Sequence, residues 1–188
     1  MKLNLGCGDQ IKEGYVNLDI IPFKGVDVLH DMNKFPYPFK DNTFEEVIAV
    51  HVLEHTQDLF KTMQELFRIC KDKAILKIIV PHYTHSTAFT CPDHKRFFGI
   101  DSLGHFGGLY FQYRCKAKFA LKSNKLVFNR YLDALTLNLM GKLFNKVPRF
   151  YENYLSSFIP AGSIHTQLRV IKNFKIRDSF KSKLDHGN

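Results

Sequence analysis

The chain has 188 residues, which suits one domain with a full hydrophobic core, and 45% of its residues are hydrophobic. No apolar run approaches the roughly twenty residues that span a bilayer, and the N-terminus carries no basic-then-apolar leader, so we expect a cytoplasmic protein. The net charge of +9 favours an anionic partner, and four scattered cysteines without a C-x-x-C pair argue against a disulfide framework or cysteine zinc site. We expect a single domain over residues 1–178 and a flexible tail over 179–188.

The first predicted element is a short buried strand that ends in a glycine-rich turn. Leu3 and Leu5 precede Gly6-Cys7-Gly8, where the backbone can approach a ligand closely because neither glycine has a Cβ. A second short apolar run, Tyr15–Ile20, carries a carboxylate at Asp19. An acid at the tip of a neighbouring parallel strand can accept hydrogen bonds from two ribose hydroxyls. The turn and the acid together predict a nucleoside site.

This pattern differs from the dinucleotide-binding fingerprint. Ile11 occupies the place of the third glycine, and Asp19 comes eleven residues after Gly8 rather than about twenty. A phosphate-binding loop with its lysine is also missing from the sequence, so a ligand with little or no phosphate is favoured. The alternative is that Gly6 and Gly8 only form a turn.

Further strands and one clear helix follow along the chain. A third strand over 26–30, a proline-rich loop over 35–39, a fourth strand over 46–50, an amphipathic helix over 58–71 and a fifth strand over 74–80 are predicted. Strands that alternate with turns and a helix indicate an α/β protein with a doubly wound, mostly parallel sheet. The first connection, from Leu5 to Val16, is too short for a full crossover helix, so we expect a vestigial helical turn there.

The remaining chain begins with a loop rich in histidines, over 82–98. A hairpin over 113–131 that turns at Ser123-Asn124, helices over 132–144 and 150–158, and a last strand over 163–172 are predicted after it. Cations cluster late in the chain, at Arg114, Lys116, Lys118, Lys122, Lys125 and Arg130. The first three alternate with apolar residues, which is typical of a strand with one solvated face. A nucleic-acid partner remains a less favoured alternative, because no known recognition motif accompanies these cations.

Five motifs in this order resemble those of the class I S-adenosylmethionine-dependent methyltransferases. They are the segments 3–8, 17–19, 35–44, 51–55 and the strand that leads to Val80-Pro-His82. The chain is more narrowly similar to a compact bacterial branch associated with surface-polysaccharide genes. In that branch the fifth strand is followed by Pro-His and then Pro-x-His-x-Arg-Phe, as in residues 81–82 and 92–97 here.

The resemblance implies a seven-stranded Rossmann-like methyltransferase fold with a shortened first crossover and an antiparallel last strand. It also implies S-adenosyl-L-methionine as cofactor and methyl transfer to a small-molecule or glycan hydroxyl. The basic residues from Arg114 to Lys125 leave RNA as an alternative acceptor. Cofactor-binding positions carried over from the family are Asn4, Leu5, Gly6, Cys7, Gly8, Asp19, Ile20, Asp31, Met32 and His51. Adenosylmethionine is a cationic nucleoside without phosphate, which agrees with the site predicted from the residues themselves.

Transfer to a hydroxyl benefits from a general base, and a neutral histidine suits that role. His82 and His94 are our candidates, because the loop after the fifth strand lies beside the carboxyl ends of the strands, where such sheets bind ligands. We expect Asp93 to orient the base, and Arg96 either to bind an anionic acceptor or to pair with a carboxylate. The alternative for these histidines is a hydrogen bond to backbone.

Two metal hypotheses also arise from the histidines, although we predict no metal. Residues 51–55 spell H-x-x-E-H, a signature of zinc metalloproteases, and a zinc-dependent hydrolase is the remote alternative. His82, His85 and His94 with Asp93 form a second candidate cluster. The sequence leaves open the methyl acceptor and the oligomeric state.

Overall fold

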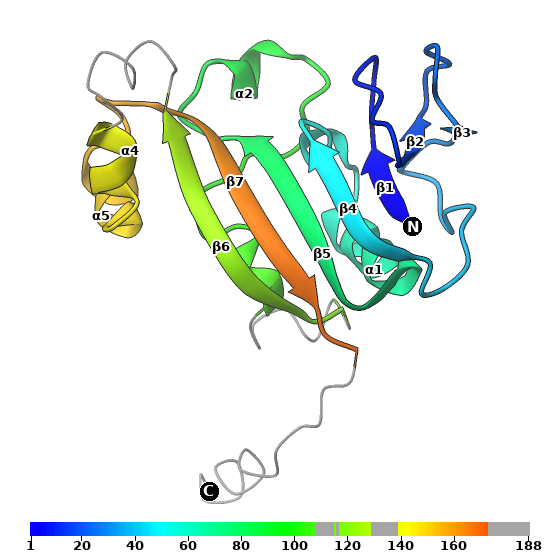
Figure 1. Ribbon diagram of the computed structural model, residues 1–188. Coiled ribbons are helices and arrows are strands. Elements are labelled where there is room, and N and C mark those ends of the chain that lie inside the picture. The colour runs from blue at the N-terminus through cyan, green and yellow to red at the C-terminus, as the bar shows by residue number, and fades with distance from the viewer. Residues whose placement is uncertain (108–114, 116, 129–138, 173–188) are drawn as a thin grey trace, which may run out of the picture.

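The computed structural model describes residues 1–107, 115, 117–128 and 139–172, which form one seven-stranded sheet with flanking helices (Figure 1). The strands are β1 (Lys2–Leu5), β2 (Val16–Asp19), β3 (Val28–Leu29), β4 (Phe44–Val50), β5 (Cys70–Pro81), β6 (Phe119–Phe128) and β7 (Ala161–Val170). The helices are η1 (Leu53–His55), α1 (Leu59–Ile69), α2 (Thr87–Thr90), η2 (Gly104–Gly107), α4 (Leu139–Phe144) and α5 (Pro148–Tyr154). Within those ranges, no helix has the length and hydropathy needed to cross a membrane.

The strand order is β3-β2-β1-β4-β5-β7-β6. The five strands from β1 to β5 pair in parallel, and β7 runs antiparallel to both β5 and β6. This confirms the predicted mostly parallel sheet with an antiparallel last strand. The chain builds outward on one side of β1 as far as β3, then returns to its other side at β4. At such a switch point the loops after neighbouring strands diverge and leave room for a ligand at the carboxyl edge.

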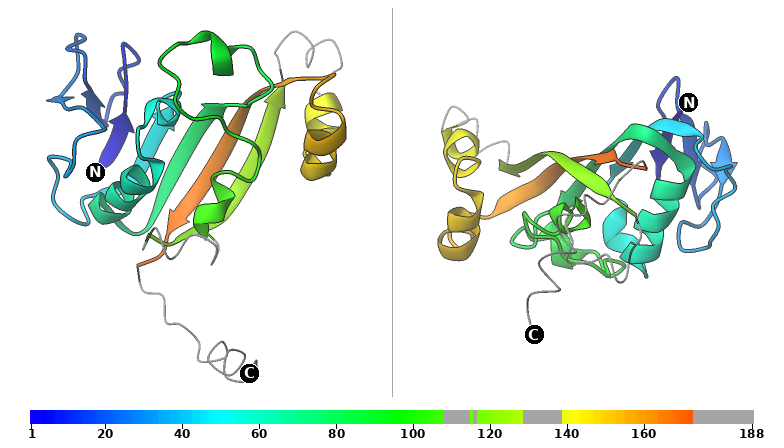
Figure 2. Two further views of the ribbon diagram at one scale, coloured as in Figure 1. Left: turned by 180° about the vertical axis from the view of Figure 1, so that it is seen from behind. Right: turned by 90° about the horizontal axis from the view of Figure 1, so that it is seen from below.

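The core lies between the sheet and α1, which covers the face of β4 and β5 seen in the left view of Figure 2. Met63, Leu66 and Ile69 of α1 are fully buried, as their spacing in the sequence predicts. The helix begins after Asp58, whose side chain accepts the N–H of Lys61 at 3.1 Å. The predicted helix over 58–71 is thus confirmed to within two residues at each end.

Turns, and no helix, connect β1 to β2. The backbone N–H of Gln10 donates to the Cys7 carbonyl oxygen at 2.9 Å, and the Tyr15 N–H donates to the Lys12 carbonyl oxygen at 3.3 Å. The Asn17 side chain holds this loop, because its Oδ1 accepts the Lys12 N–H at 2.9 Å. Across residues 1–81, all of which are described, α1 is the only α-helix. The shortened first crossover is therefore confirmed.

The predicted hairpin at Ser123-Asn124 is wrong. These two residues lie in the middle of β6, opposite Gln167 and Thr166 of β7. The Asn124 Oδ1 accepts the Thr166 hydroxyl at 2.7 Å, and the Asn124 Nδ2 donates to the Ile100 carbonyl oxygen. The Asn124 side chain, whose polarity led to the prediction of a turn, thus finds its hydrogen-bond partners in β7 and at Ile100. Of the basic stripe, Arg114, Lys116 and Arg130 lie outside the described residues, as does the tail over 179–188.

Candidate active site

A cavity of about 350 Å³ lies at the carboxyl ends of β1 to β4, where the loops after these strands meet. We call it the first cavity. It is lined by Gly6, Gly8, Leu18, Asp19, Ile20, Ile21, Phe23, His30, Asp31, Met32, Asn33, His51, Val52, His55, Asp93 and Lys95. Seven of the ten predicted cofactor-binding residues are among them: Gly6, Gly8, Asp19, Ile20, Asp31, Met32 and His51.

The two glycines of the first turn both have a left-handed backbone, with φ of +60° at Gly6 and +53° at Gly8. A Cβ on Gly6 would lie 2.1 Å from Cγ2 of Val52, so the loop after β4 packs directly against this residue. A Cβ on Gly8 would meet no atom within 4 Å. Gly6 is therefore required by packing, whereas Gly8 leaves bare backbone at the cavity wall.

The Asp19 carboxylate and the glycine turn are joined directly. Its Oδ2 accepts the Gly8 N–H at 2.7 Å, and its Oδ1 accepts the Ile21 N–H at 2.9 Å. Each carboxylate oxygen can accept two hydrogen bonds, so each retains one acceptor position for a ligand. The predicted pairing of bare backbone with a strand-end acid is thus present on one wall of the first cavity.

The first cavity is acidic although the chain as a whole is basic. Asp19, Asp31 and Asp93 line it, and Lys95 is its only lysine or arginine. The ammonium group of Lys95 lies 3.5 Å from the Asp93 carboxylate, so even this cation is paired. Ile20 adds an apolar surface, with 63% of its area exposed. A cationic ligand with a flat apolar part suits these walls.

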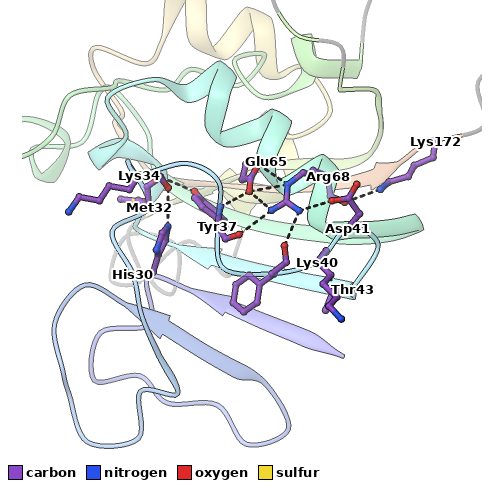
Figure 3. Close-up of polar contacts among 11 residues, drawn as sticks. His30, Met32, Lys34, Tyr37, Lys40, Asp41, Thr43, Glu65, Arg68 and Lys172 are labelled. Atoms are coloured by element: carbon purple, nitrogen blue, oxygen red, sulfur yellow. Dashed lines mark hydrogen bonds and ion pairs between the residues drawn. The ribbon is translucent and has the colours of Figure 1, made fainter.

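A buried network fixes the wall of the first cavity at Met32 (Figure 3). The Tyr37 hydroxyl donates to the Met32 carbonyl oxygen at 3.0 Å, and the Tyr37 N–H donates to the Glu65 carboxylate at 2.6 Å. Arg68 of α1 pairs with Glu65 and also donates to the Phe39 carbonyl oxygen at 2.9 Å. The proline-rich loop is therefore tied to the helix by charge-assisted hydrogen bonds.

The other three predicted cofactor positions, Asn4, Leu5 and Cys7, are buried and do not line the first cavity. Asn4 donates to the Gln10 carbonyl oxygen at 2.9 Å and so supports the loop after the glycine turn. Burial raises the pKa of the Cys7 thiol, and the nearby Asp19 charge adds to this shift. These three residues therefore support the glycine turn from the core side.

A second cavity of about 570 Å³ adjoins the first and shares His51 and His55 with it. It is lined by His51, Glu54, His55, Pro81, His85, Thr87, Thr90, Cys91, His94, Gly162 and Ser163. His51 follows β4 with a left-handed φ of 52°, and His55 is the last residue of η1. The H-x-x-E-H segment therefore does not lie within one long helix, as the metalloprotease arrangement requires.

Glu54 joins the loop after β4 to the loop after β5. Its carbonyl oxygen accepts the N–H groups of Lys95 at 2.8 Å and Arg96 at 3.1 Å. The Arg96 guanidinium donates in turn to the carbonyl oxygens of Thr56, at 3.2 Å, and Gln57. Arg96 thus fastens the two loops through the carbonyl oxygens of Thr56 and Gln57.

His82 lies away from both cavities. Its side chain is 0% exposed, with Nδ1 2.7 Å from the Thr84 hydroxyl and Nε2 3.1 Å from Oε1 of Glu152. Burial lowers the pKa of His82, against the opposing effect of Glu152. A substrate cannot reach this imidazole without displacing its neighbours, so its predicted role as base is not carried into our proposal.

His94 and Asp93, the other two predicted catalytic residues, do lie at the cavities. His94 lines the second cavity, and its Nδ1 lies 3.0 Å from the Ala88 carbonyl oxygen. Asp93 lines the first cavity, and its Oδ2 lies 3.1 Å from Nδ1 of His55. Asp93 thus orients His55, a residue that we did not predict in the site. The sequence signal for His55 was the H-x-x-E-H spacing.

A family model described as a methyltransferase domain matches residues 22–78. This match covers 57 of the 188 residues. The fold agrees, because S-adenosylmethionine-dependent methyltransferases from Archaeoglobus fulgidus and Mesorhizobium loti superpose with TM-scores of 0.55 and 0.57. Their identities are 16% and 11%, over 89% of this chain in each case and over 85% and 89% of theirs.

Two other similarities set limits on the function. An uncharacterized protein of Methanocaldococcus jannaschii, MJ0638, is 49% identical over 43 residues, which are 23% of this chain and 19% of that protein. The [4+2]-cyclase SpnF has a TM-score of 0.56 at 15% identity, over 90% of this chain and 74% of that one. The methyltransferase fold therefore also occurs in a protein named for a different reaction, so the function has to be argued from the site.

The methyltransferase family implies S-adenosylmethionine as cofactor, and the first cavity fits this group. A cationic sulfonium matches three carboxylates, and a ribose matches the two acceptor positions that Asp19 retains. The open space beside Gly8 admits a ligand against bare backbone.

Proposed function

We propose that this methyltransferase transfers a methyl group from S-adenosylmethionine to a hydroxyl of a small molecule or glycan. The cofactor occupies the first cavity and the acceptor the second. The observation that carries this proposal is that two cavities, one of them acidic in a chain of net charge +9, meet at His51 and His55. Adjacent cavities bring two reactants together, which is the main requirement for a direct transfer.

Asp19 and the backbone at Gly8 hold the ribose, while Ile20 and Met32 supply apolar contacts for the base. The carboxylates of Asp31 and Asp93 favour a positively charged ligand at the same wall. When bound, the cofactor supplies an electrophilic methyl group on its sulfonium sulfur. The chain's own contribution is to align the acceptor and to exclude competing water.

Polar groups in the second cavity support an acceptor with several hydroxyls. Thr87, Thr90 and Ser163 offer hydroxyl groups, and His85 offers an imidazole. Groups that both donate and accept hydrogen bonds suit a sugar, whose hydroxyls do the same. The resemblance to methyltransferases of polysaccharide genes points in the same direction.

We assign the general base to His51, because it lines both cavities and so can contact an acceptor next to the cofactor. Its Nδ1 lies 3.4 Å from Oε1 of the buried Glu54, which orients the ring and stabilises the imidazolium after proton uptake. His94 faces the second cavity only, and Asp93 acts on His55. Both remain positioning candidates, in place of the base and its partner predicted from the sequence.

Calorimetry with S-adenosylhomocysteine tests the cofactor assignment on the wild-type chain. We expect one binding site per chain, and the absence of measurable binding would refute the function. Transfer of a radiolabelled methyl group to a panel of free sugars and nucleotide sugars then tests the acceptor class. We expect His51→Ala to lower turnover by a larger factor than it raises the Kd for S-adenosylhomocysteine, because His51 lines both cavities. A turnover equal to wild type would remove His51 as the base.

A further inference from the structure

A cluster of metal-binding side chains stands at the boundary between the two cavities. One ring nitrogen of His55, one of His94 and the Cys91 sulfur all lie within 4.8 Å of one another. His55 comes from η1 and the other two come from the loop after α2, so the cluster exists because Glu54 and Arg96 fasten these segments together. The two metal hypotheses drawn from the sequence each contained one of its histidines, and neither contained Cys91.

In both imidazoles the contacts among the described residues hold Nδ1 and leave Nε2 available to a metal. Nδ1 of His94 lies 3.0 Å from the Ala88 carbonyl oxygen, and Nδ1 of His55 lies 3.1 Å from the Asp93 carboxylate. Carbonyl and carboxylate oxygens only accept, so both Nδ1 atoms carry the hydrogen and both Nε2 atoms keep a lone pair. Metal-binding histidines are oriented in this way, by a carbonyl or a carboxylate on the other nitrogen.

The buried carboxylate of Glu54 is an independent observation that favours a cation at this place. Glu54 is 1% exposed, and its Oε2 has no hydrogen-bond partner among the residues that the structure describes. Its Oε1 lies 4.0 Å from Nε2 of His94 and 3.4 Å from Nδ1 of His51. A buried charge is costly unless it is paired or lies near a metal. The groups that face this carboxylate are therefore two histidines, of which one belongs to the cluster.

Cys91 is the one cysteine that a solute can approach. All four cysteines lie in described residues, and Cys7, Cys70 and Cys115 are buried, whereas Cys91 is half-buried and lines the second cavity. Two imidazoles with one thiolate are a donor set that zinc prefers. Tetrahedral zinc holds such atoms about 3.3 to 3.6 Å apart, so side-chain movements of about 1 Å close the cluster around an ion.

We propose that His55, Cys91 and His94 bind a divalent transition metal ion, with zinc as the preferred ion, beside the carboxylate of Glu54. Three protein ligands leave a fourth coordination position open on the second cavity. If the proposed function holds, that position takes an oxygen atom of the acceptor. The metal site itself does not depend on the proposed function.

Metal analysis of the full, untagged chain tests the site directly. We expect about one zinc per chain after purification, by mass spectrometry of the digested protein. After removal of zinc with a chelator, Co²⁺ should give the visible bands of a tetrahedral ion and a thiolate-to-cobalt charge-transfer band in the ultraviolet. A chain that binds neither ion overturns the proposal.

Variants identify the ligands and separate metal binding from folding. Cys91→Ser should abolish the charge-transfer band and weaken zinc binding by at least about 100-fold, and His94→Ala should weaken it similarly. Asp93→Ala removes the carboxylate that accepts from His55 and also pairs with Lys95, and it should weaken zinc binding by about 10- to 100-fold. Retention of the charge-transfer band in Cys91→Ser overturns the assignment.

Two matched controls accompany these variants. His85→Ala removes another histidine of the same cavity, whose Nδ1 is engaged by the Thr87 hydroxyl at 2.8 Å, and Cys115→Ser removes a buried thiol elsewhere. Both should bind Co²⁺ like the wild type, and loss of the band in either one contradicts the assignment. Calorimetry with S-adenosylhomocysteine on Cys91→Ser distinguishes the two proposals, because binding should persist there when the metal is lost.

Discussion

Replacing Asp19 with alanine separates what its carboxylate does for the fold from what it does for a ligand. In the protein it accepts two backbone N–H groups, from Gly8 at 2.7 Å and Ile21 at 2.9 Å. A hydrogen bond to a charged group contributes about 1.5 to 3 kcal/mol. Asp19 is only half-buried and both N–H groups can turn to water, so we expect Asp19→Ala to lose about 3 kcal/mol of unfolding free energy.

The same carboxylate offers one further acceptor position on each oxygen. Two ribose hydroxyls that donate to these positions contribute about 3 kcal/mol to binding, which corresponds to about 100-fold in Kd. We therefore expect the Kd of Asp19→Ala for S-adenosylhomocysteine to rise by about 100-fold, measured by isothermal titration calorimetry. Urea unfolding of the same sample gives the structural loss separately.

Asp27→Ala is the matched control for the structural part. The Asp27 carboxylate also accepts two hydrogen bonds at the edge of the sheet, from the Asn17 N–H at 2.7 Å and the Asn17 side chain at 3.1 Å, but it does not line the first cavity. We expect a similar loss of stability with a Kd within about threefold of wild type. Two results refute the reasoning: a Kd for Asp19→Ala within about threefold of wild type, or equal weakening in both variants.

Three further predictions concern the supports of the site. Gly6→Ala should lose about 2 to 5 kcal/mol of unfolding free energy in urea, because its Cβ would lie 2.1 Å from a methyl group of Val52 in a left-handed backbone. Arg68→Ala should lose about 3 kcal/mol and weaken S-adenosylhomocysteine binding in calorimetry, because the loop behind Met32 loses its anchor. His82 has a folded pKa below the ordinary 6.5, so the unfolded chain binds more protons just below that pH. Stability should therefore be complete above pH 6.5 and fall as the pH is lowered through it, and the urea midpoint of His82→Asn should fall less over the same range.

Each of these three substitutions has a control substitution at a similar residue. Gly8→Ala, where a Cβ meets nothing within 4 Å, should lose only about 1 to 2 kcal/mol, and a loss equal to that of Gly6→Ala would contradict the packing argument. Lys61→Ala removes an exposed cation of α1 and should leave the Kd unchanged. His85→Asn removes an accessible imidazole and should keep the pH dependence of the wild type. If the urea midpoint of His82→Asn falls with pH as steeply as that of the wild type, His82 is not the group that causes the loss of stability.

The sequence predicted that the glycine turn and Asp19 lie together, because the signals for both are local. A glycine turn directly after β1 and an acid at the end of β2 must meet wherever two neighbouring strands are parallel, and the structure joins Gly8 to Asp19 by a hydrogen bond. Asn4 and Cys7 were carried over from the family resemblance, and here both are buried and do not line the first cavity. A family motif does not tell which of its residues face a ligand and which face the core.

The orientation of His82 and the strand at Ser123-Asn124 depend on long-range contacts, which the sequence does not reveal. His82 follows a strand at the expected edge, yet the ring turns to Glu152, seventy residues later in the chain. Ser123-Asn124 has the composition of a turn, but pairing with β7 overrides that local preference. Both errors have one physical cause: a polar side chain adopts the conformation that satisfies its hydrogen bonds, and its partner here comes from a distant segment.

The meeting of the two cavities at one short segment has a consequence for binding. His51 and His55 contact both spaces, and the segment between them is held to the loop after β5 by the Glu54 carbonyl oxygen and the Arg96 guanidinium. A ligand in either cavity that orders this segment would lower the ordering cost for a ligand in the other, so we expect binding to the two cavities to be positively coupled. Linkage makes this coupling reciprocal: if S-adenosylhomocysteine raises the affinity for Co²⁺ by some factor, Co²⁺ must raise the affinity for S-adenosylhomocysteine by the same factor. Arg96→Ala, which releases the segment without removing a cavity-lining group, should reduce both factors towards one.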